Sequence, residues 1–96
     1  MRNYEIMMIV KPTLSEAETK KVVENFSKAL TDNGANIKEA KEIGQRELAY
    51  EIKDFKSGYY YLYVVEANDD KAVKEFDRLA LISNDIIRHL ITNLEK

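Results

Sequence analysis

The chain has 96 residues, enough for one domain with a substantial core, and 45% of them are apolar, which argues against disorder. Cysteine is absent, which excludes disulfides, thiolate metal ligands and cysteine nucleophiles and is consistent with a reducing cytoplasm. No apolar run approaches the roughly 20 residues that span a bilayer, and the net charge of −2 argues against a strongly basic nucleic-acid-binding coat.

The first part of the chain predicts a strand, a helix and the start of a second strand. Residues 4–10 are rich in apolar side chains and indicate a strand. Ser15 and Glu18 have the spacing of a capping box, and Gly34 follows the last helical position, so a helix is expected between them. Residues 37–43 open the second strand. The buried face of the helix is predicted to consist of Val22, Val23, Phe26, Ala29 and Leu30.

A long hairpin is predicted for the middle of the chain. Gly44 lies inside the second strand and indicates a bulge or bend. From residue 47 to residue 53 apolar and charged side chains alternate, which is typical of a strand with one buried face. Residues 54–58 have the composition of a turn, in which we expect Gly58 to supply a positive φ. Residues 59–65 are apolar or aromatic at every position, which favours a central strand covered on both faces.

The last third of the chain predicts a helix followed by a strand. Residues 68–70, Asn-Asp-Asp, provide capping side chains for a second helix. Ser83 and Asn84 end that helix, and residues 86–94 indicate a final strand. The buried stripe of the helix is predicted to be Ala72, Val73, Phe76, Leu79 and Ala80.

The resulting order, βαββαβ, is that of a ferredoxin-like α+β fold, with two helices on one face of a four-stranded antiparallel sheet. Right-handed crossovers place the first and third strands in the centre and the other two at the edges. We therefore expect residues 1–96 to form a single ferredoxin-like domain. The sheet face away from the helices would expose apolar side chains such as Met7 or Met8, Tyr60 and Leu62.

No set of residues predicts catalysis or cofactor binding. His89 is the only histidine, and without cysteine or a second histidine it cannot complete a zinc site. The serines do not form a nucleophile elbow, and the three glycines are isolated, so no phosphate-binding loop is expected. We therefore predict a protein that is not an enzyme and has no metal, no cofactor and no small-molecule substrate.

An RNA-recognition motif has the same topology and carries aromatic residues on its third strand. Residues 56–61, Lys-Ser-Gly-Tyr-Tyr-Tyr, match that pattern loosely. The middle of the first strand, residues 6–9, supplies no aromatic partner, so packing of the tyrosines within the sheet is the simpler interpretation. A single-stranded RNA-binding domain of this type remains the alternative hypothesis.

The basic residues near the hairpin are candidates for contacts with phosphates. Between residues 38 and 58, five basic and five acidic residues cancel, so binding of RNA requires that the charges separate in space or that a basic partner contributes. The candidates are Arg2, Arg46, Lys53 and Lys56.

Short motifs along nearly the whole chain are similar, in order and spacing, to those of one known family. They are Arg2-Asn3-Tyr4-Glu5-Ile6-Met7, Asn33-Gly34-Ala35, Gly44-Gln45-Arg46-Glu47-Leu48-Ala49-Tyr50, Gly58-Tyr59, Phe76-Asp77-Arg78-Leu79 and Ile87-Arg88-His89. On these residues the chain resembles the bacterial small-subunit ribosomal protein six family.

The resemblance implies a ferredoxin-like fold, no catalysis and a place on the cytoplasmic ribosome, away from membranes. It also implies binding to the central domain of small-subunit ribosomal RNA (rRNA), together with the small basic ribosomal protein eighteen. On this basis Arg2, Arg46 and Lys53, with Lys56 in addition, are expected to lie near RNA or that partner. Family members usually have basic residues on both sides of Arg46, where this chain has Gln45 and Glu47.

Overall fold

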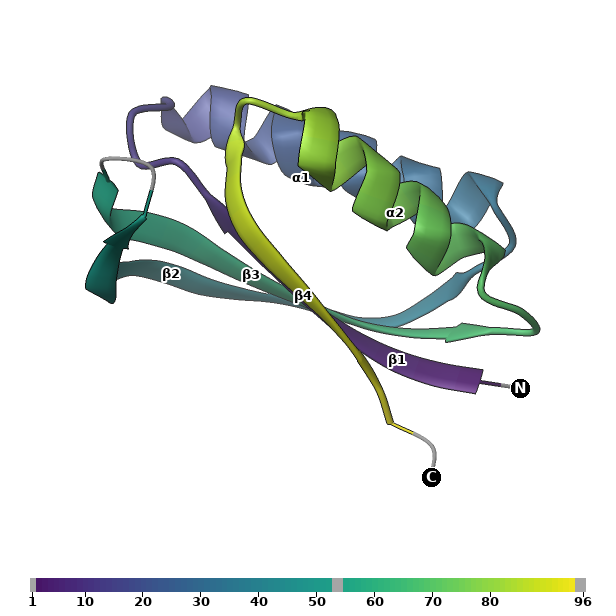
Figure 1. Cartoon of the computed structure of the whole chain (residues 1–96). Coiled ribbons are helices and arrows are strands. Elements are labelled where there is room, and N and C mark those ends of the chain that lie inside the picture. The colour runs from purple at the N-terminus through teal and green to yellow at the C-terminus, as the bar shows by residue number, and fades with distance from the viewer. Residues whose placement is uncertain (1, 53–54, 95–96) are drawn as a thin grey trace.

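The computed structural model describes residues 2–52 and 55–94. Its elements are β1 (Arg2–Val10), α1 (Glu16–Asp32), β2 (Asn36–Ile52), β3 (Phe55–Ala67), α2 (Lys71–Ile82) and β4 (Ile86–Asn93). The four strands form one antiparallel sheet in the order β2-β3-β1-β4, which confirms the predicted ferredoxin-like topology with β1 and β3 in the centre. Among the described residues both helices lie on one side of the sheet, and the other side carries none (Figure 1).

The two faces of the sheet are assigned from the register and from one buried tyrosine. The Tyr63 hydroxyl hydrogen-bonds to the Val23 carbonyl and the Ser27 hydroxyl of α1, each at 2.9 Å, so the odd-numbered side chains of β3 point toward the helices. Ile6 is the partner of Tyr63 on β1, and therefore the even-numbered residues of β1 share that side. We call this side the helix side and the opposite side the open face.

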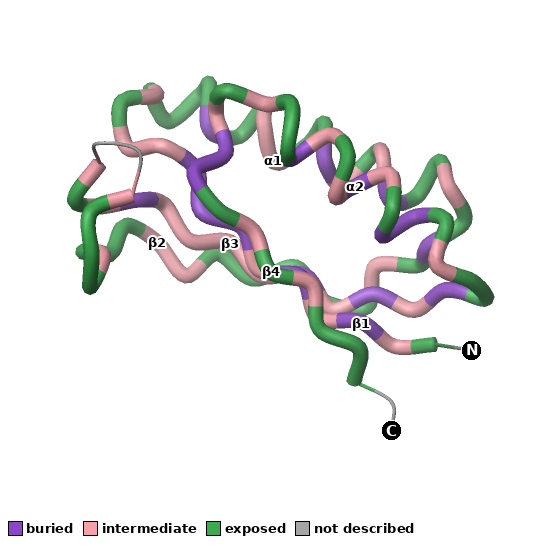
Figure 2. The backbone as a smooth tube through the Cα atoms, in the orientation of Figure 1, coloured by how far each residue is buried: buried purple, intermediate pink, exposed green. Residues whose placement is uncertain are grey.

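The core lies between the helices and the sheet, where buried segments face each other (Figure 2). The rings of Phe26 on α1 and Phe76 on α2 lie 4.9 Å apart, and the edge of Tyr63 meets Phe76 at 6.2 Å. On β3, Tyr63 is fully buried, whereas Tyr60 and Leu62 on the open face are half-buried. The expectation that residues 59–65 are fully covered on both faces was therefore wrong, because helices cover one face only.

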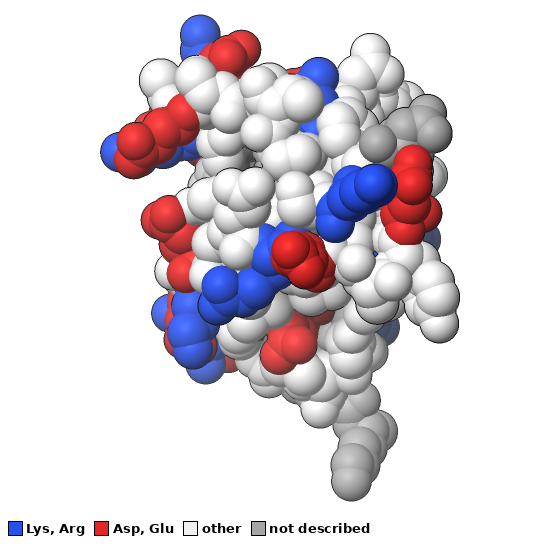
Figure 3. Space-filling view, turned by 90° about the vertical axis from the view of Figure 1, so that its left-hand side faces the viewer, with Lys and Arg blue, Asp and Glu red and all other residues white. Residues whose placement is uncertain are grey.

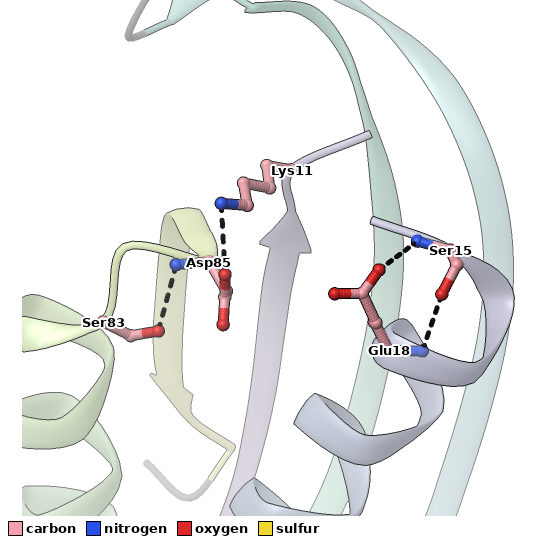
Figure 4. Close-up of polar contacts among 5 residues, drawn as sticks. All are labelled: Lys11, Ser15, Glu18, Ser83 and Asp85. Carbon is pink, nitrogen blue, oxygen red and sulfur yellow. Dashed lines mark hydrogen bonds and ion pairs between the residues drawn. The ribbon is translucent and has the colours of Figure 1, made fainter. Parts of the chain in front are cut away.

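Both ends of α1 are capped as the sequence predicts. The Ser15 side chain accepts a hydrogen bond from the Glu18 N–H at 3.2 Å, and the Ser15 N–H donates to the Glu18 carboxylate at 3.1 Å (Figure 4). At the other end Gly34 has a φ of 91°, and the Ala35 N–H donates to the Leu30 carbonyl at 3.0 Å. These are the bonds of a Schellman ending. Within the described part of the chain, no helix is long and apolar enough to cross a membrane.

The glycines of the hairpin act differently from each other. Gly44 has a φ of 100° at a register shift between β2 and β3, which confirms the predicted bulge. The described glycines with positive φ are Gly34 and Gly44, so the positive φ expected at Gly58 was wrong. Gly58 lies inside β3, where an added Cβ would stand 2.2 Å from the Ile9 Cγ2 methyl. Its role is to let two central strands approach closely.

The end of the hairpin is less regular than the alternating sequence predicts. β3 begins at Phe55, so residues 55–58 of the predicted turn belong to the strand, and residues 53–54 are outside the described ranges. The register shifts between Glu47 and Ile52, which takes the intervening residues of β2 out of regular pairing. Tyr50, expected on a buried face, is 84% exposed. The helices do not extend over this end of the hairpin (Figure 1).

Candidate nucleic-acid interface

The structure brings together two of the four predicted site residues. Arg46 pairs with Gly58 and so points to the open face, as does Lys56, two residues before Gly58 on β3. Both side chains are exposed. Arg2 lies at the other end of the sheet on the helix side, where a hydrogen bond to Tyr4 raises its pKa. Lys53 lies outside the described residues.

Two further cations occupy the open face beside Arg46 and Lys56. Lys41 on β2 pairs with Leu62, and Arg88 on β4 pairs with Ile9, so both point away from the helices. Both are exposed. We call Lys41, Arg46, Lys56 and Arg88 the basic cluster. It draws on three strands and surrounds a partly apolar surface that includes Tyr60, Leu62 and the 52%-exposed Leu90.

Acidic residues are concentrated on the other half of the same face. The cross-strand row through Leu62 contains Lys41, and the row through Tyr60 contains Arg88. Among the described residues, neither row contains an acid. The acidic residues of this face lie on the opposite half of the sheet. Glu5 and Glu39 are the cross-strand partners of Val64, and Glu66 follows two residues later on β3. Lys38 is paired with Glu66 at 3.3 Å on the acidic half. The open face therefore separates part of the charge that cancels in the sequence.

The hairpin tip mixes both signs of charge. Glu47, Glu51 and Lys56 line one hollow of about 510 Å³. Glu47 pairs with Ser57 and so points to the helix side, but it shares this hollow with Lys56 of the basic cluster. From this end of the molecule, patches of acidic and basic side chains are scattered over a largely uncharged surface (Figure 3).

The tyrosines of β3 are divided between the two faces. Tyr60 is on the open face, whereas Tyr59, Tyr61 and Tyr63 point to the helix side. At the neighbouring positions of β1 the open face presents Met7 and Ile9. Of the two methionines that the sequence left open for this face, it is therefore Met7 that lies on it. An RNA-recognition motif stacks two or three bases on aromatic side chains of neighbouring strands in its sheet. Here the central strands offer one ring for that purpose.

Sequence reasoning missed Lys41 and Arg88 as members of the site. Lys41 lies between two register shifts of β2, so its face does not follow from counting alternate residues. Arg88 belongs to β4, 42 positions after Arg46 in the sequence, and only strand pairing brings them to one face. The glycine at position 44 was the one available signal that the alternation changes.

Residues with catalytic potential have structural partners. His89 Nε2 lies 2.6 Å from the Asp77 carboxylate, which links β4 to α2. Lys11 reaches Asp85 at 3.3 Å and ties the end of β1 to the start of β4 (Figure 4). Across residues 2–52 and 55–94, no group of three His, Cys, Asp or Glu side chains is arranged to hold a metal ion.

The fold and this surface define a small ferredoxin-like α+β protein with one uncovered, partly basic sheet face. A family model described as Ribosomal protein S6 matches residues 3–93, and the chain therefore belongs to the ribosomal protein S6 family of the small subunit. It is 50% identical over 96 residues to small ribosomal subunit protein bS6 of Shouchella clausii (strain KSM-K16), with all of both chains covered. The crystal structure of 30S ribosomal protein S6 from Thermotoga maritima matches with a TM-score of 0.92 and 28% identity, covering 96% of this chain and 86% of that one. The predicted family is confirmed.

Proposed function

We propose that this protein is a non-catalytic structural constituent of the small ribosomal subunit. Acting as one domain of residues 1–96 on the cytoplasmic ribosome, it binds the central domain of small-subunit rRNA together with ribosomal protein eighteen. The basic cluster contacts phosphates, and Arg2 and Lys53 are further contacts outside it. The observation that carries this proposal is the separation of charge along the open face.

The small number of cations in the basic cluster explains why a partner is needed. Each phosphate that a cation neutralises contributes to affinity through release of counterions. Four such contacts from Lys41, Arg46, Lys56 and Arg88 are few for a protein of net charge −2. A basic partner that binds next to this surface would supply the remaining neutralisation. The protein alone is therefore expected to bind rRNA weakly, and the pair tightly.

The test is a titration of a central-domain rRNA fragment at several salt concentrations, with and without ribosomal protein eighteen. Arg88→Gln and Arg46→Gln should each reduce the slope of log affinity against log salt by about one unit for the pair. Arg78→Gln is the matched control, because Arg78 is exposed on α2 and paired with Glu75, in the layer away from the open face. It should leave the slope unchanged.

Three results would contradict the proposal. Tight, salt-sensitive binding by the protein alone would refute dependence on the partner. Absence of binding with the partner would refute the rRNA function. A folded Tyr60→Ala variant that loses about 1–3 kcal/mol of affinity for single-stranded RNA would support the recognition-motif alternative. Tyr61→Ala should have no such effect, since Tyr61 lies on the helix side.

A further inference from the structure

A cavity of about 590 Å³ lies on the helix side, between the first half of α1 and strands β2 and β3. This volume is within the range of sites that hold small ligands. The cavity is separated from the basic cluster by the sheet itself, because its β3 residues, Tyr59 and Tyr61, point away from the open face. The proposed contact with rRNA does not use it.

The floor of the cavity is aromatic and held in place. The Tyr61 ring lies 5.0 Å from the ring of Tyr63, which is itself fully buried. Burial and a hydrogen bond to Glu42 raise the pKa of Tyr59 to about 12, so its phenol stays neutral at physiological pH. Two tyrosines with fixed orientations therefore present their rings to whatever enters.

The rim of the cavity is acidic. Glu16 and Glu24 on α1 and Glu42 on β2 line it, against a single cation on α1, Lys20. The other basic side chain at the rim, Lys11, is paired with Asp85 at 3.3 Å (Figure 4). This charge is opposite to that of the basic cluster. Phosphate is therefore disfavoured here, and a cation is favoured.

We propose that the cavity binds an arginine side chain that projects from a basic protein partner. A planar guanidinium can stack on a tyrosine ring while its N–H groups donate to a carboxylate, and the tyrosine floor and the glutamate rim offer both. This inference rests on the proposed function, whose partner is basic, and assigns that partner to the side of the sheet opposite the rRNA. RNA and partner would then bind two surfaces of opposite charge.

The test compares variants that carry the same charge change on different faces. Glu42→Gln keeps an acceptor for Tyr59 but removes the rim charge, and it should weaken binding of ribosomal protein eighteen by about tenfold, as loss of one charge-assisted hydrogen bond would. Glu39→Gln is the matched control, because Glu39 is an exposed acid of the same strand on the open face. It should change affinity less than twofold. Isothermal titration calorimetry without RNA measures both.

For a second pair of variants we expect the opposite change in affinity for ribosomal protein eighteen. Lys20→Gln removes the rim cation and should strengthen binding two- to threefold, on the order of one weakly screened surface charge. Lys21→Gln removes an exposed charge of the same helix that does not line the cavity, and it should have no effect. Equal effects of Glu42→Gln and Glu39→Gln, or of Lys20→Gln and Lys21→Gln, would overturn the cavity as the contact.

A small probe separates this inference from the proposed function. Nα-acetyl-arginine amide, titrated into the 15N-labelled protein, should shift the amide signals of Tyr59 and Tyr61, and Glu42→Gln should abolish these shifts. If ribosomal protein eighteen does not bind the wild-type protein, the proposed function fails, and the arginine titration alone decides whether the cation site exists. If the partner binds and the probe shifts neither tyrosine, the inference is overturned while the proposed function stands.

Discussion

Replacing Gly58 with alanine should force apart the two central strands. The new Cβ would stand 2.2 Å from Ile9 Cγ2 and 3.4 Å from the Val10 carbonyl oxygen. Ile9 is 3% exposed, and its Cγ2 methyl is attached directly to a branched Cβ, so it can move only if the rotamer or the strand moves. Overpacking of this kind costs about 1–3 kcal/mol. Restriction of the unfolded chain returns about 0.4–1 kcal/mol, which leaves an expected net loss of about 1–2 kcal/mol.

Gly44→Ala is the control for conformational strain without a steric clash. No heavy atom lies within 4 Å of an added Cβ there, but the φ of 100° disfavours any L-residue with a side chain. Its expected cost is about 1 kcal/mol, from the backbone alone. Ile9→Ala removes the methyl that obstructs position 58 and should therefore couple to Gly58→Ala by about 1 kcal/mol or more, but not to Gly44→Ala.

Equilibrium urea denaturation, followed by circular dichroism, measures all of these free energies of unfolding. The Gly58→Ala and Ile9→Ala double mutant should be more stable than the sum of the two single losses predicts. A neutral Gly58→Ala variant would refute the steric reasoning. Strict additivity with Ile9→Ala would refute it as well, since it would show that the cost has another origin.

Three further predictions concern the core, pH and surface charge. Phe26→Ala should lose roughly 3–5 kcal/mol of stability in urea denaturation, because Phe26 is buried against Phe76; a loss well under 1 kcal/mol would contradict the assignment of the core. Burial raises the pKa of Tyr63. The stability that the neutral phenol contributes is therefore complete below the unfolded pKa of about 10 and is lost as the pH rises above that value. Tyr63→Phe should flatten this decline of stability at alkaline pH, and an unchanged decline would exclude Tyr63 as its source. Glu47→Arg should tighten the complex of rRNA and partner modestly and only at low salt, because Glu47 is exposed on the helix side and its charge acts on the RNA through solvent; equal tightening at high salt would show direct contact.

The elements of the fold were predictable because local and long-range signals agree. Ser15 and Glu18 cap α1 by contacts that span one helical turn, and such local contacts can be predicted from the spacing of the two residues in the sequence. Phe26 and Phe76 lie at helical spacing on faces that both need burial, and they meet in the core. The order of the elements then restricts the topology, since the crossovers must be right-handed.

The site was predicted only in part because its residues depend on register. Each shift of one position along β2 moves a side chain to the opposite face, and β2 has three such irregularities. Lys41 lies between two of them, and Tyr50 lies within the third. Gly58 shows a related limit: a glycine near a turn indicates freedom of φ, whereas its contact with Ile9 exists only once β1 and β3 are paired.

The net charge of −2 describes neither surface that the protein presents. The basic cluster and the acidic cavity lie on opposite sides of one sheet, and a layer of packed structure is about 10 Å thick. At physiological salt the Debye length is about 8 Å, so charges on one side are largely screened from a ligand on the other. At about 0.01 M salt it reaches about 30 Å, and RNA approaching the open face would then also meet the field of the acidic side. Attraction between the isolated protein and RNA should therefore stop increasing as salt is lowered, whereas the attraction of the pair should continue to increase, because a basic partner in the cavity neutralises that field.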